Sequence, residues 1–341
     1  MKRILILLAS AALAAGCGQP DKAAAPEKIV LAYVTGWGNP VIPDTGLMTH
    51  INYAFGHVNE TFDGVNVQNP GRLAEIAALK EIKPSLKICL SIGGWGSGNF
   101  SEMASDAGRR RAFAEDCVRK VEEFGLDGID IDWEYPTNGE AGISSSPDDT
   151  ENFTLLMAEL RKALGPDRLL TYASDDSAMF IDHKAVLPYV DFVNAMAYDM
   201  AKAPMISSAL YESDNTTEFT ADRSVRAHLE AGIPKDRLVM GLPFYGRGSA
   251  EKYSDYTNFR DIDTTDTRFT VKWDDKALVP YIADASGELV FNYENPHSIR
   301  LKCEYALEND LAGVMYWDYG ADDDSSSLRK TVAREIFGAQ E

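Results

Sequence analysis

The stretch Leu126-Asp-Gly-Ile-Asp-Ile-Asp-Trp-Glu134 predicts a buried strand with acids on one face. Successive side chains in a strand point to opposite faces. One face therefore carries Asp130, Asp132 and Glu134. The other face carries Ile129, Ile131 and Trp133. Such a pattern favours a parallel strand with helices behind it and a polar site at its end. Carboxylates this close cannot all ionise freely, so at least one is expected to hold its proton unusually tightly, as a general acid does.

Two plainer interpretations of this stretch compete. A calcium loop needs oxygen ligands at set spacings and a glycine at its turn, but here Ile, Ile and Trp separate the acids and the glycine comes first. A merely structural acidic strand would bury unpaired acids at a cost. The spacing Asp127-x-x-Asp130-x-Asp132-x-Glu134 resembles the signature of glycoside hydrolase family 18, the chitinases and their relatives.

Length and charge set the outer limits. The 341 residues suit two average domains or one α/β barrel, which typically needs about 250 residues. The net charge of −20 argues against nucleic acid and anionic membrane surfaces as partners. It is compatible with a neutral or cationic polymer as substrate.

The N-terminal residues predict export. Residues 1–16 combine Lys2 and Arg3 with a short apolar run, as a signal peptide does. The following Ala14-Ala15-Gly16-Cys17 resembles a bacterial lipoprotein processing site, which implies a lipid on Cys17. Residues 17–27 would then be a tether and residues 28–341 the catalytic part. We expect a protein exported across the inner membrane that touches a cell-envelope membrane only through its lipid. Ordinary cleavage with an incidental Cys17 is the alternative.

The remaining cysteines and the histidines predict no special site. Cys89, Cys117 and Cys303 are too few for a disulfide framework, and the sequence leaves open whether Cys117 and Cys303 meet. None of the five histidines has the spacing of a metal site.

Apolar runs alternate with helical stretches along the chain. Strands are expected at 29–34, 50–55, 86–92, around the acidic stretch, and at 169–174, 192–198, 238–245 and 313–317. Helices are expected at 71–80, 109–124, 152–164, 221–231 and 296–309. Eight strands with helices between them predict a closed (β/α)₈ barrel, a TIM barrel. An open doubly wound sheet is the alternative, but the sequence has no Gly-rich phosphate turn.

Residues 248–295 interrupt this alternation and predict a small insertion between the seventh strand and the following helix. They include two short strand patterns, at 271–274 and 288–293. The segment resembles a trimmed version of the α+β insertion of some family 18 chitinases. A surface excursion without structure is less expected, because long structureless loops are uncommon.

Further motifs follow the predicted strand ends, where barrel enzymes place their sites. Ser91-Ile92-Gly93-Gly94-Trp95 resembles a second motif of the family, and its glycines allow close backbone approach. Met196-Ala197-Tyr198-Asp199 and Gly241-Leu-Pro-Phe-Tyr-Gly-Arg247 resemble two more. Trp317 ends the eighth strand, and an indole face can support the apolar face of a sugar. Trp37 and Trp95 are candidates for neighbouring subsites, with core positions as their alternative.

The resemblance implies a chitinase that cleaves β-1,4 bonds between N-acetylglucosamine units of chitin or its oligomers. The substrate's own acetamido group would attack the anomeric carbon, so that configuration is retained. Glu134 would be the acid and base, Asp132 would orient the acetamide, and Asp130 would hold Asp132. Tyr198 would grip the acetamido oxygen, with Asp199 beside it, Met196 beneath the sugar, and Tyr245 and Arg247 in contact with substrate. No metal or organic cofactor is implied, and a monomer is expected.

Three alternatives remain open. An endo-β-N-acetylglucosaminidase acting on N-glycans would share the same acids. A non-catalytic chitin lectin often lacks the terminal acid, which is present here as Glu134. A conventional retaining glycosidase would use Asp199 as its nucleophile and would not need an N-acetyl group on its substrate.

Overall fold

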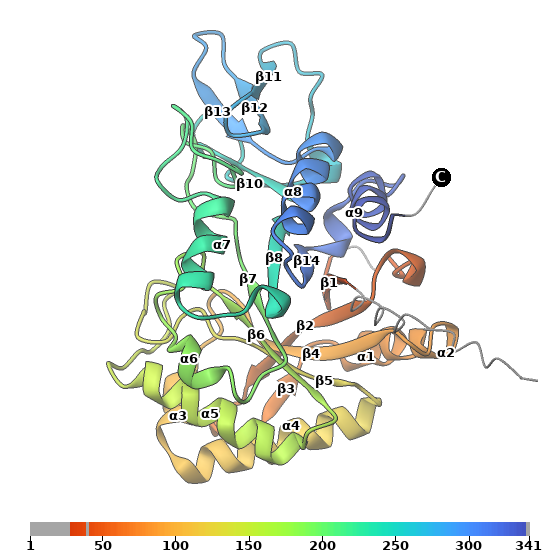
Figure 1. The fold of residues 1–341 in the computed structure, drawn as a ribbon, viewed down its shortest axis with the longest axis vertical. Coiled ribbons are helices and arrows are strands. Elements are labelled where there is room, and N and C mark those ends of the chain that lie inside the picture. Colours follow the sequence, from red (N-terminus) through yellow and green to blue (C-terminus); the bar gives the residue numbers. More distant parts are fainter. Residues whose placement is uncertain (1–27, 39–40, 339–341) are drawn as a thin grey trace, which may run out of the picture.

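The computed structural model of the chain describes residues 28–38 and 41–338. The predicted signal segment, Cys17 and the tether lie outside these residues. Figure 1 shows a barrel whose strands run through the centre of the molecule, with helices around it and a small sheet at one end.

Eight parallel strands form the barrel. In spatial order they are β1 (Ile29–Thr35), β2 (His50–Val58), β4 (Lys87–Gly93), β5 (Gly128–Asp132), β6 (Leu169–Ser174), β7 (Phe192–Ala195), β8 (Leu238–Pro243) and β14 (Gly313–Trp317). Strand β1 pairs with β2 on one side and with β14 on the other, which closes the sheet. The predicted (β/α)₈ barrel is therefore confirmed, and the open-sheet alternative is wrong.

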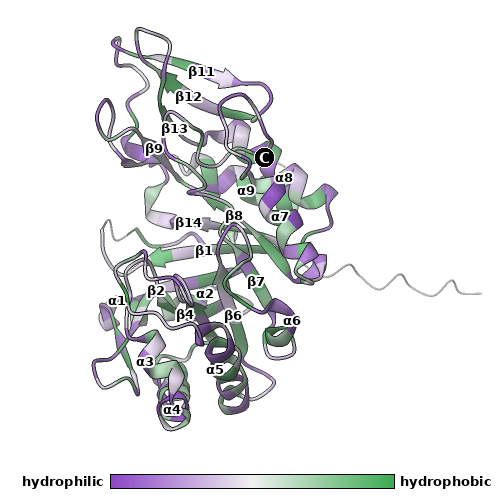
Figure 2. Cartoon of the chain, turned by 90° about the vertical axis from the view of Figure 1, so that its left-hand side faces the viewer, coloured by the Kyte–Doolittle hydropathy of each residue, from purple (hydrophilic) through white to green (hydrophobic). Residues whose placement is uncertain are grey.

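Helices cover the outside of the barrel. They are α1 (Pro70–Ala77), α2 (Leu79–Ile82), α3 (Phe100–Ser105), α4 (Ala107–Phe124), α5 (Asp149–Leu164), α6 (His183–Val186), α7 (Ala221–Glu230), α8 (Pro296–Glu308) and α9 (Ser327–Phe337). Short 3₁₀ turns occupy Thr45–Leu47, Lys235–Arg237, Phe259–Asp261 and Tyr319–Ala321. Figure 2 shows helices such as α4 and α5 with both hydrophobic and hydrophilic residues, as expected for helices with one face on a core.

Local signals explain where α4, which precedes the acidic strand, begins and ends. The Asp106 side chain accepts hydrogen bonds from the amides of Gly108 and Arg109, and so caps the first turn. Gly125 ends the helix in the left-handed region with φ of 65°. This places the start of β5 three residues later.

The apolar face of the acidic strand lies in the main core. Ile129, Ile131 and Trp133 are at most 1% exposed and pack among the side chains between barrel and helices. The Trp133 ring stacks on Phe100 with 5.3 Å between ring centres. Each such buried side chain contributes about 1.5–3 kcal/mol of transfer free energy. This packing fixes the register of β5 and turns its acids toward the barrel interior.

The predicted insertion is an antiparallel sheet of β9 (Tyr245–Gly248), β10 (Tyr256–Asn258), β11 (Thr270–Asp274), β12 (Val279–Ala283) and β13 (Leu289–Asn292). It stands at the top of Figure 1. Its first strand begins at Tyr245, earlier than expected, because β9 follows β8 after a single residue. A further strand that was not predicted, β3 (Val65–Val67), pairs antiparallel with β2.

The three cysteines in the described part of the chain are buried free thiols, so Cys117 and Cys303 are not bonded to each other. Among the helices of residues 28–38 and 41–338, none combines the length and apolar character needed to cross a membrane.

Candidate active site

The acids of β5 lead into a cleft of about 850 Å³ at the carboxyl ends of the barrel strands. Strand β5 ends at Asp132, so Glu134 stands two residues beyond it and not on the strand as predicted. Most of the predicted site residues line this cleft: Trp95, Asp132, Glu134, Met196, Tyr198, Asp199, Tyr245, Arg247 and Trp317. Asp130, which is fully buried, and Trp37 are not among the lining residues.

Asp130 is completely buried and fully hydrogen-bonded. One carboxylate oxygen accepts from Thr171 Oγ1 at 2.6 Å and Asn194 Nδ2 at 3.2 Å. The other accepts from Ser91 Oγ at 2.8 Å and the Tyr33 hydroxyl at 3.0 Å. Burial raises the pKa of Asp130, and the four hydrogen bonds oppose that rise. Strands β1, β4, β6 and β7 thus meet at this carboxyl group.

Asp132 has a different environment. It is 4% exposed, and its Oδ1 has no hydrogen-bond partner among the described residues. Burial, then the charges of Glu134 and Asp130, raise the pKa of Asp132 well above its usual value. Asp132 also lines the cleft, so its carboxyl group stands where a bound molecule can contact it.

Glu134 is partly buried at the cleft surface. Burial raises the pKa of Glu134 to about 7, the charge of Asp199 adds to the rise, and a hydrogen bond with the Tyr135 side chain opposes it. A carboxyl group with this pKa is protonated in a large fraction of molecules near neutral pH. It can donate a proton to a bound molecule and later take one back.

The glycines of the second motif make room for this arrangement. A side chain on Gly93 would place its Cβ 1.9 Å from the Asp132 carbonyl oxygen, and the φ of Gly93 is +133°. A Cβ on Gly94 would lie 2.5 Å from the Phe55 ring. The amide of Gly94 donates to the Asp132 carbonyl at 2.8 Å. Only glycine therefore allows β4 to approach the end of β5 so closely.

The Met196–Asp199 motif faces the acids from β7. The Tyr198 hydroxyl has only a long contact with Met315 Sδ, at 3.9 Å. Burial and the charges of Asp132 and Glu134 raise the pKa of Tyr198 well above its usual value, so the hydroxyl stays a donor. It can therefore donate to an oxygen of a molecule bound in the cleft.

Side chains of β9, the first strand of the insertion, contact Asp199. The Tyr245 hydroxyl donates to its Oδ2 at 2.7 Å, and Arg247 Nε lies 3.4 Å from its Oδ1. Both partners belong to β9. Tyr245 thus hydrogen-bonds one oxygen of Asp199, and the charge of Arg247 lies beside the other.

Two groups of aromatic side chains contribute to the lining of the cleft. We call the first the Trp317 wall; it comprises Tyr33, Trp37, Phe55 and Trp317. In this wall the rings of Phe55 and Trp317 stack at 5.5 Å, and Trp37 lies 6.2 Å from Trp317. We call the second the Phe180 wall; it comprises Trp95, Tyr135 and Phe180. Tyr135 stacks on Phe180 at 5.1 Å, and Trp95 lies 6.4 Å from Tyr135. Such faces suit the apolar faces of sugar rings.

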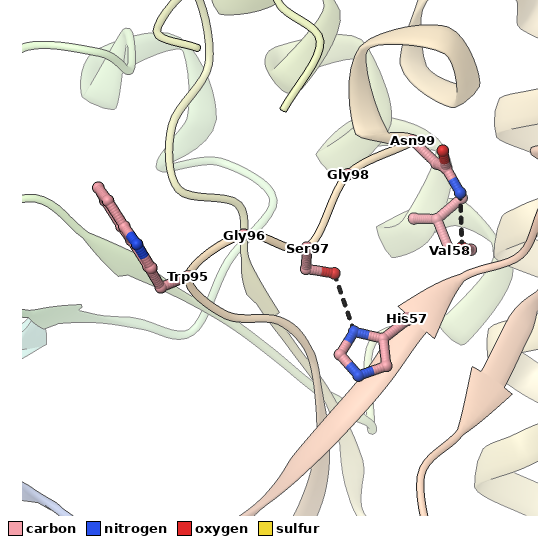
Figure 3. Close-up of a pocket in the computed structure, with 7 residues that line it drawn as sticks. All are labelled: His57, Val58, Trp95, Gly96, Ser97, Gly98 and Asn99. Atoms are coloured by element: carbon pink, nitrogen blue, oxygen red, sulfur yellow. Dashed lines mark hydrogen bonds between the residues drawn. The ribbon is translucent and has the colours of Figure 1, made fainter. Parts of the chain in front are cut away.

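A separate shallow hollow of about 310 Å³ lies on the outer side of Trp95. Figure 3 shows His57, Ser97 and Asn99 among its lining residues, and the His57 ring contacts Ser97 Oγ at 2.9 Å. No acid lines this hollow. We therefore place the chemistry in the larger cleft. Within residues 28–38 and 41–338, no group of three or more His, Cys, Asp or Glu side chains could hold a metal ion.

Some cleft residues have no signal in the sequence. Phe55, Phe180 and Tyr256 line the cleft but belong to no motif that the sequence analysis identified. Tyr33 could have been suggested by strand alternation, since it lies two residues after Leu31 on the inner face of β1. The cis peptide bonds Ala54–Phe55, Glu134–Tyr135 and Trp317–Asp318 also had no sequence signal.

Comparison with known proteins gives a consistent result. Residues 29–322 match the model of glycosyl hydrolases family 18. Chitinase A1 of Niallia circulans is 31% identical over 325 residues, which cover 80% of this chain and 46% of that protein. The chain thus spans less than half of that relative's length. A family 18 N-acetylglucosaminidase of Paenibacillus barengoltzii has a similar structure, with a TM-score of 0.81 and 34% identity over 91% of this chain and 100% of that one. The group IV chitinase of Ostrinia furnacalis gives a TM-score of 0.83 and 27% identity over 91% and 100% of the two chains.

Proposed function

Because the chain belongs to glycosyl hydrolase family 18, we propose that this chitinase-like hydrolase cleaves β-1,4 bonds between N-acetylglucosamine units with retention of configuration. The substrate's acetamido oxygen is the nucleophile. Glu134 is the acid and base, Asp132 orients the acetamide, and Tyr198 donates to the acetamido oxygen. Chitin oligomers are the expected substrates.

The reaction proceeds in two steps. The acetamido oxygen attacks the anomeric carbon while the glycosidic bond breaks and Glu134 gives its proton to the leaving oxygen. Asp132 stabilises the positive charge that develops on the cyclised ring. Water then attacks the anomeric carbon, the Glu134 carboxylate takes its proton, and the acetamide is restored. Two displacements retain the configuration.

The observation that carries this proposal is the placement of Asp199, the carboxylate that could otherwise act as a nucleophile. Its Oδ2 accepts a hydrogen bond from Tyr245, and Arg247 Nε lies 3.4 Å from its Oδ1. Asp132, by contrast, is buried beside Glu134 and has one oxygen without a hydrogen-bond partner among the described residues. This arrangement favours a substrate that supplies its own nucleophile and needs only one proton donor.

The experiment compares N-acetylated and deacetylated sugars at the cleaved unit. We expect cleavage only after an N-acetylated unit, β-anomeric first products, and strong inhibition by a thiazoline that mimics the cyclised intermediate. Efficient cleavage after glucose or glucosamine, or a glycosyl ester trapped on Asp199, would instead establish the conventional retaining scheme.

Release of single N-acetylglucosamine units is a second candidate, because the similar Paenibacillus barengoltzii structure is that of an N-acetylglucosaminidase. A panel of chitin oligomers, a high-mannose glycopeptide and a plain β-glucan oligomer separates the possibilities. Monosaccharide as the first product indicates exo action. Cleavage of the glycopeptide indicates an N-glycan enzyme, and binding without turnover indicates a lectin.

We also propose that Cys17 carries a lipid that anchors the protein to the cell envelope. The small residues before Cys17 support this. Labelling cells with a fatty-acid analogue should mark the wild type and not Cys17→Ser. Equal labelling of both proteins would contradict the anchor.

A further inference from the structure

The Phe180 wall is bordered by acids that have no cationic partner. Asp175 and Asp176 follow β6 directly, and Glu140 stands on the loop after β5. All three line the cleft. Within residues 28–38 and 41–338, none of the three forms an ion pair with a Lys, Arg or His side chain. The two basic residues that line the cleft are paired elsewhere.

These basic residues, Lys202 and Arg247, lie with other acids. Lys202 Nζ is 3.5 Å from Asp255, and Arg247 contacts both Asp199 at 3.4 Å and Asp255 at 3.5 Å. Positive charge in the cleft is thus neutralised near β7 and β9, whereas negative charge remains unmatched beside β6. This separation of charge is a property of the cleft that the chemistry of cleavage does not need.

Beside β6, the Asp175 carboxylate has one oxygen that no hydrogen-bond donor of the described residues contacts. It is 3% exposed, and its Oδ2 accepts from the Ser177 amide at 3.0 Å, the Ser177 hydroxyl and the Met179 amide at 3.4 Å. Its Oδ1 is buried without a hydrogen-bond partner among the described residues. Unpartnered buried oxygens are rare and cost about 1–3 kcal/mol. Asp175 lines the cleft, so a ligand there that carries a donor group can approach this carboxylate.

No nearby histidine supplies the missing charge. His183 and His228 are the histidines whose titration Asp175 influences, and both are buried. Burial lowers the pKa of His183 to about 4 and also lowers the pKa of His228. Both are therefore neutral at neutral pH. Burial and the charge of Asp175 raise the pKa of Asp176 to about 6, so Asp176 is still ionised at pH 7.

We propose that the part of the cleft between Asp175, Asp176 and the Tyr135–Phe180 stack binds a glucosamine unit through its ammonium group. We place this unit within the two sugars that follow the cleaved bond, on the Phe180 wall, and the N-acetylated unit that precedes the bond on the Trp317 wall. This inference rests on the proposed function. The substrate class is partially deacetylated chitin, cut between an N-acetylglucosamine and a following glucosamine.

The chemistry of the ligand explains the preference. An ammonium group offers three donors and a positive charge, whereas an N-acetyl group offers one neutral N–H. Hydrogen bonds between ionised partners are roughly twice as strong as neutral ones. The stacked rings contact the face of the sugar. The acids favour an ammonium group over an N-acetyl group at its C2 position. The same acids would favour a polycationic chain over a neutral one as it approaches.

The test uses partially deacetylated chitin and reads the products. The first two units at each new non-reducing end are identified by mass spectrometry and compared with the average composition of the polymer. We expect the wild type to enrich glucosamine at these units roughly threefold to tenfold. Asp176→Asn should bring the enrichment close to the polymer average. Because composition is measured within each digest, a change in overall rate does not disturb the result.

Two controls test whether the negative charge of Asp176 itself causes the enrichment. Glu159→Gln removes one negative charge from the outer end of α5 and should leave the enrichment unchanged. High salt should weaken the enrichment in the wild type and not in Asp176→Asn, because salt screens the attraction. No enrichment in the wild type, or enrichment that persists in Asp175→Asn/Asp176→Asn, overturns this inference. Failure to cleave any N-acetylated chain would instead refute the proposed function.

Discussion

Two carboxyl groups of the acidic strand, in its middle and at its end, differ in how completely they are hydrogen-bonded. Asp130, at the centre of the barrel, has four hydrogen-bond donors from four other strands. Asp132, two residues later, is almost as buried but has one oxygen without a partner. The Asp130 carboxyl group links β5 to four other strands of the barrel. The Asp132 carboxyl group lacks such links, and we expect it to interact with substrate. Stability and activity should therefore separate along this one strand.

We expect the largest loss of activity from a change of Glu134, which follows Asp130 and Asp132 in the sequence and lines the cleft. Glu134→Gln keeps the shape of the side chain and removes the proton, so turnover of chitin oligomers should fall by roughly 10²–10⁴-fold. Binding of the oligomers should be largely kept, as measured by calorimetry. Near-full activity of this variant would show that another group is the acid.

Asp132→Asn should be the next most severe change. We expect kcat to fall roughly 10²-fold, because an electrostatic partner of the transition state is lost. The free energy of unfolding should stay equal or rise, because a buried and unpartnered carboxyl group is removed. Measuring kcat and urea unfolding on the same preparation tests both parts. Marked destabilisation would place Asp132 with Asp130 as a structural acid.

The pH dependence follows from the raised pKa of Glu134, which is about 7. The acid must be protonated, so activity should be retained below that pH and fall about tenfold per pH unit above it. Tyr135→Phe removes a hydrogen bond that lowers this pKa. The alkaline limb should therefore move to higher pH in this variant. A profile that does not shift would show that Tyr135 does not tune the acid.

Asp130→Asn should have the smallest effect on turnover and a clear effect on folding. One of its acceptor oxygens is replaced by a donor amide that faces hydroxyl and amide donors. We expect a loss of about 1–3 kcal/mol in the free energy of unfolding. Urea denaturation at neutral pH measures this directly. A loss of turnover as large as that of Asp132→Asn, without destabilisation, would erase the contrast between the two acids.

The sequence was sufficient to predict the barrel because its signals are local. The alternation in β5 separates acids from apolar residues whatever the partners are, and Gly125 marks the end of α4 by its backbone conformation. The motif residues Tyr198, Asp199, Tyr245 and Arg247 could be named because they follow strand ends. Their pairing across β7 and β9 could not be predicted, since the partners are 46 and 48 positions apart and meet only after folding.

The aromatic walls show the limit of such reasoning. Phe55 and Phe180 resemble ordinary core residues in the sequence, and only their contacts with Trp317 and Tyr135 place them in the cleft. Trp37 was expected to line a subsite. It lies against Phe55 and Trp317, which line the cleft, and is 46% exposed, so its place at a subsite stays a prediction. The sequence around a single tryptophan does not predict which part of its ring will pack against other side chains and which part will stay exposed.

The seam where β1 meets β14 has a consequence for the order in which the protein can become active. Lys28 donates to the Leu311 carbonyl across 283 positions of the chain, and the Tyr33 ring lies against Trp317. Contacts this distant in sequence form late in folding, because the intervening chain must first be brought together. A nascent chain without its last strand leaves β1 and β8 as open edges, which invite pairing with other chains. Tyr33 also reaches Asp130 from β1. The cleft therefore becomes complete only after residues 313–317 have been synthesised, and products truncated before them are expected to aggregate without ever passing through an active intermediate.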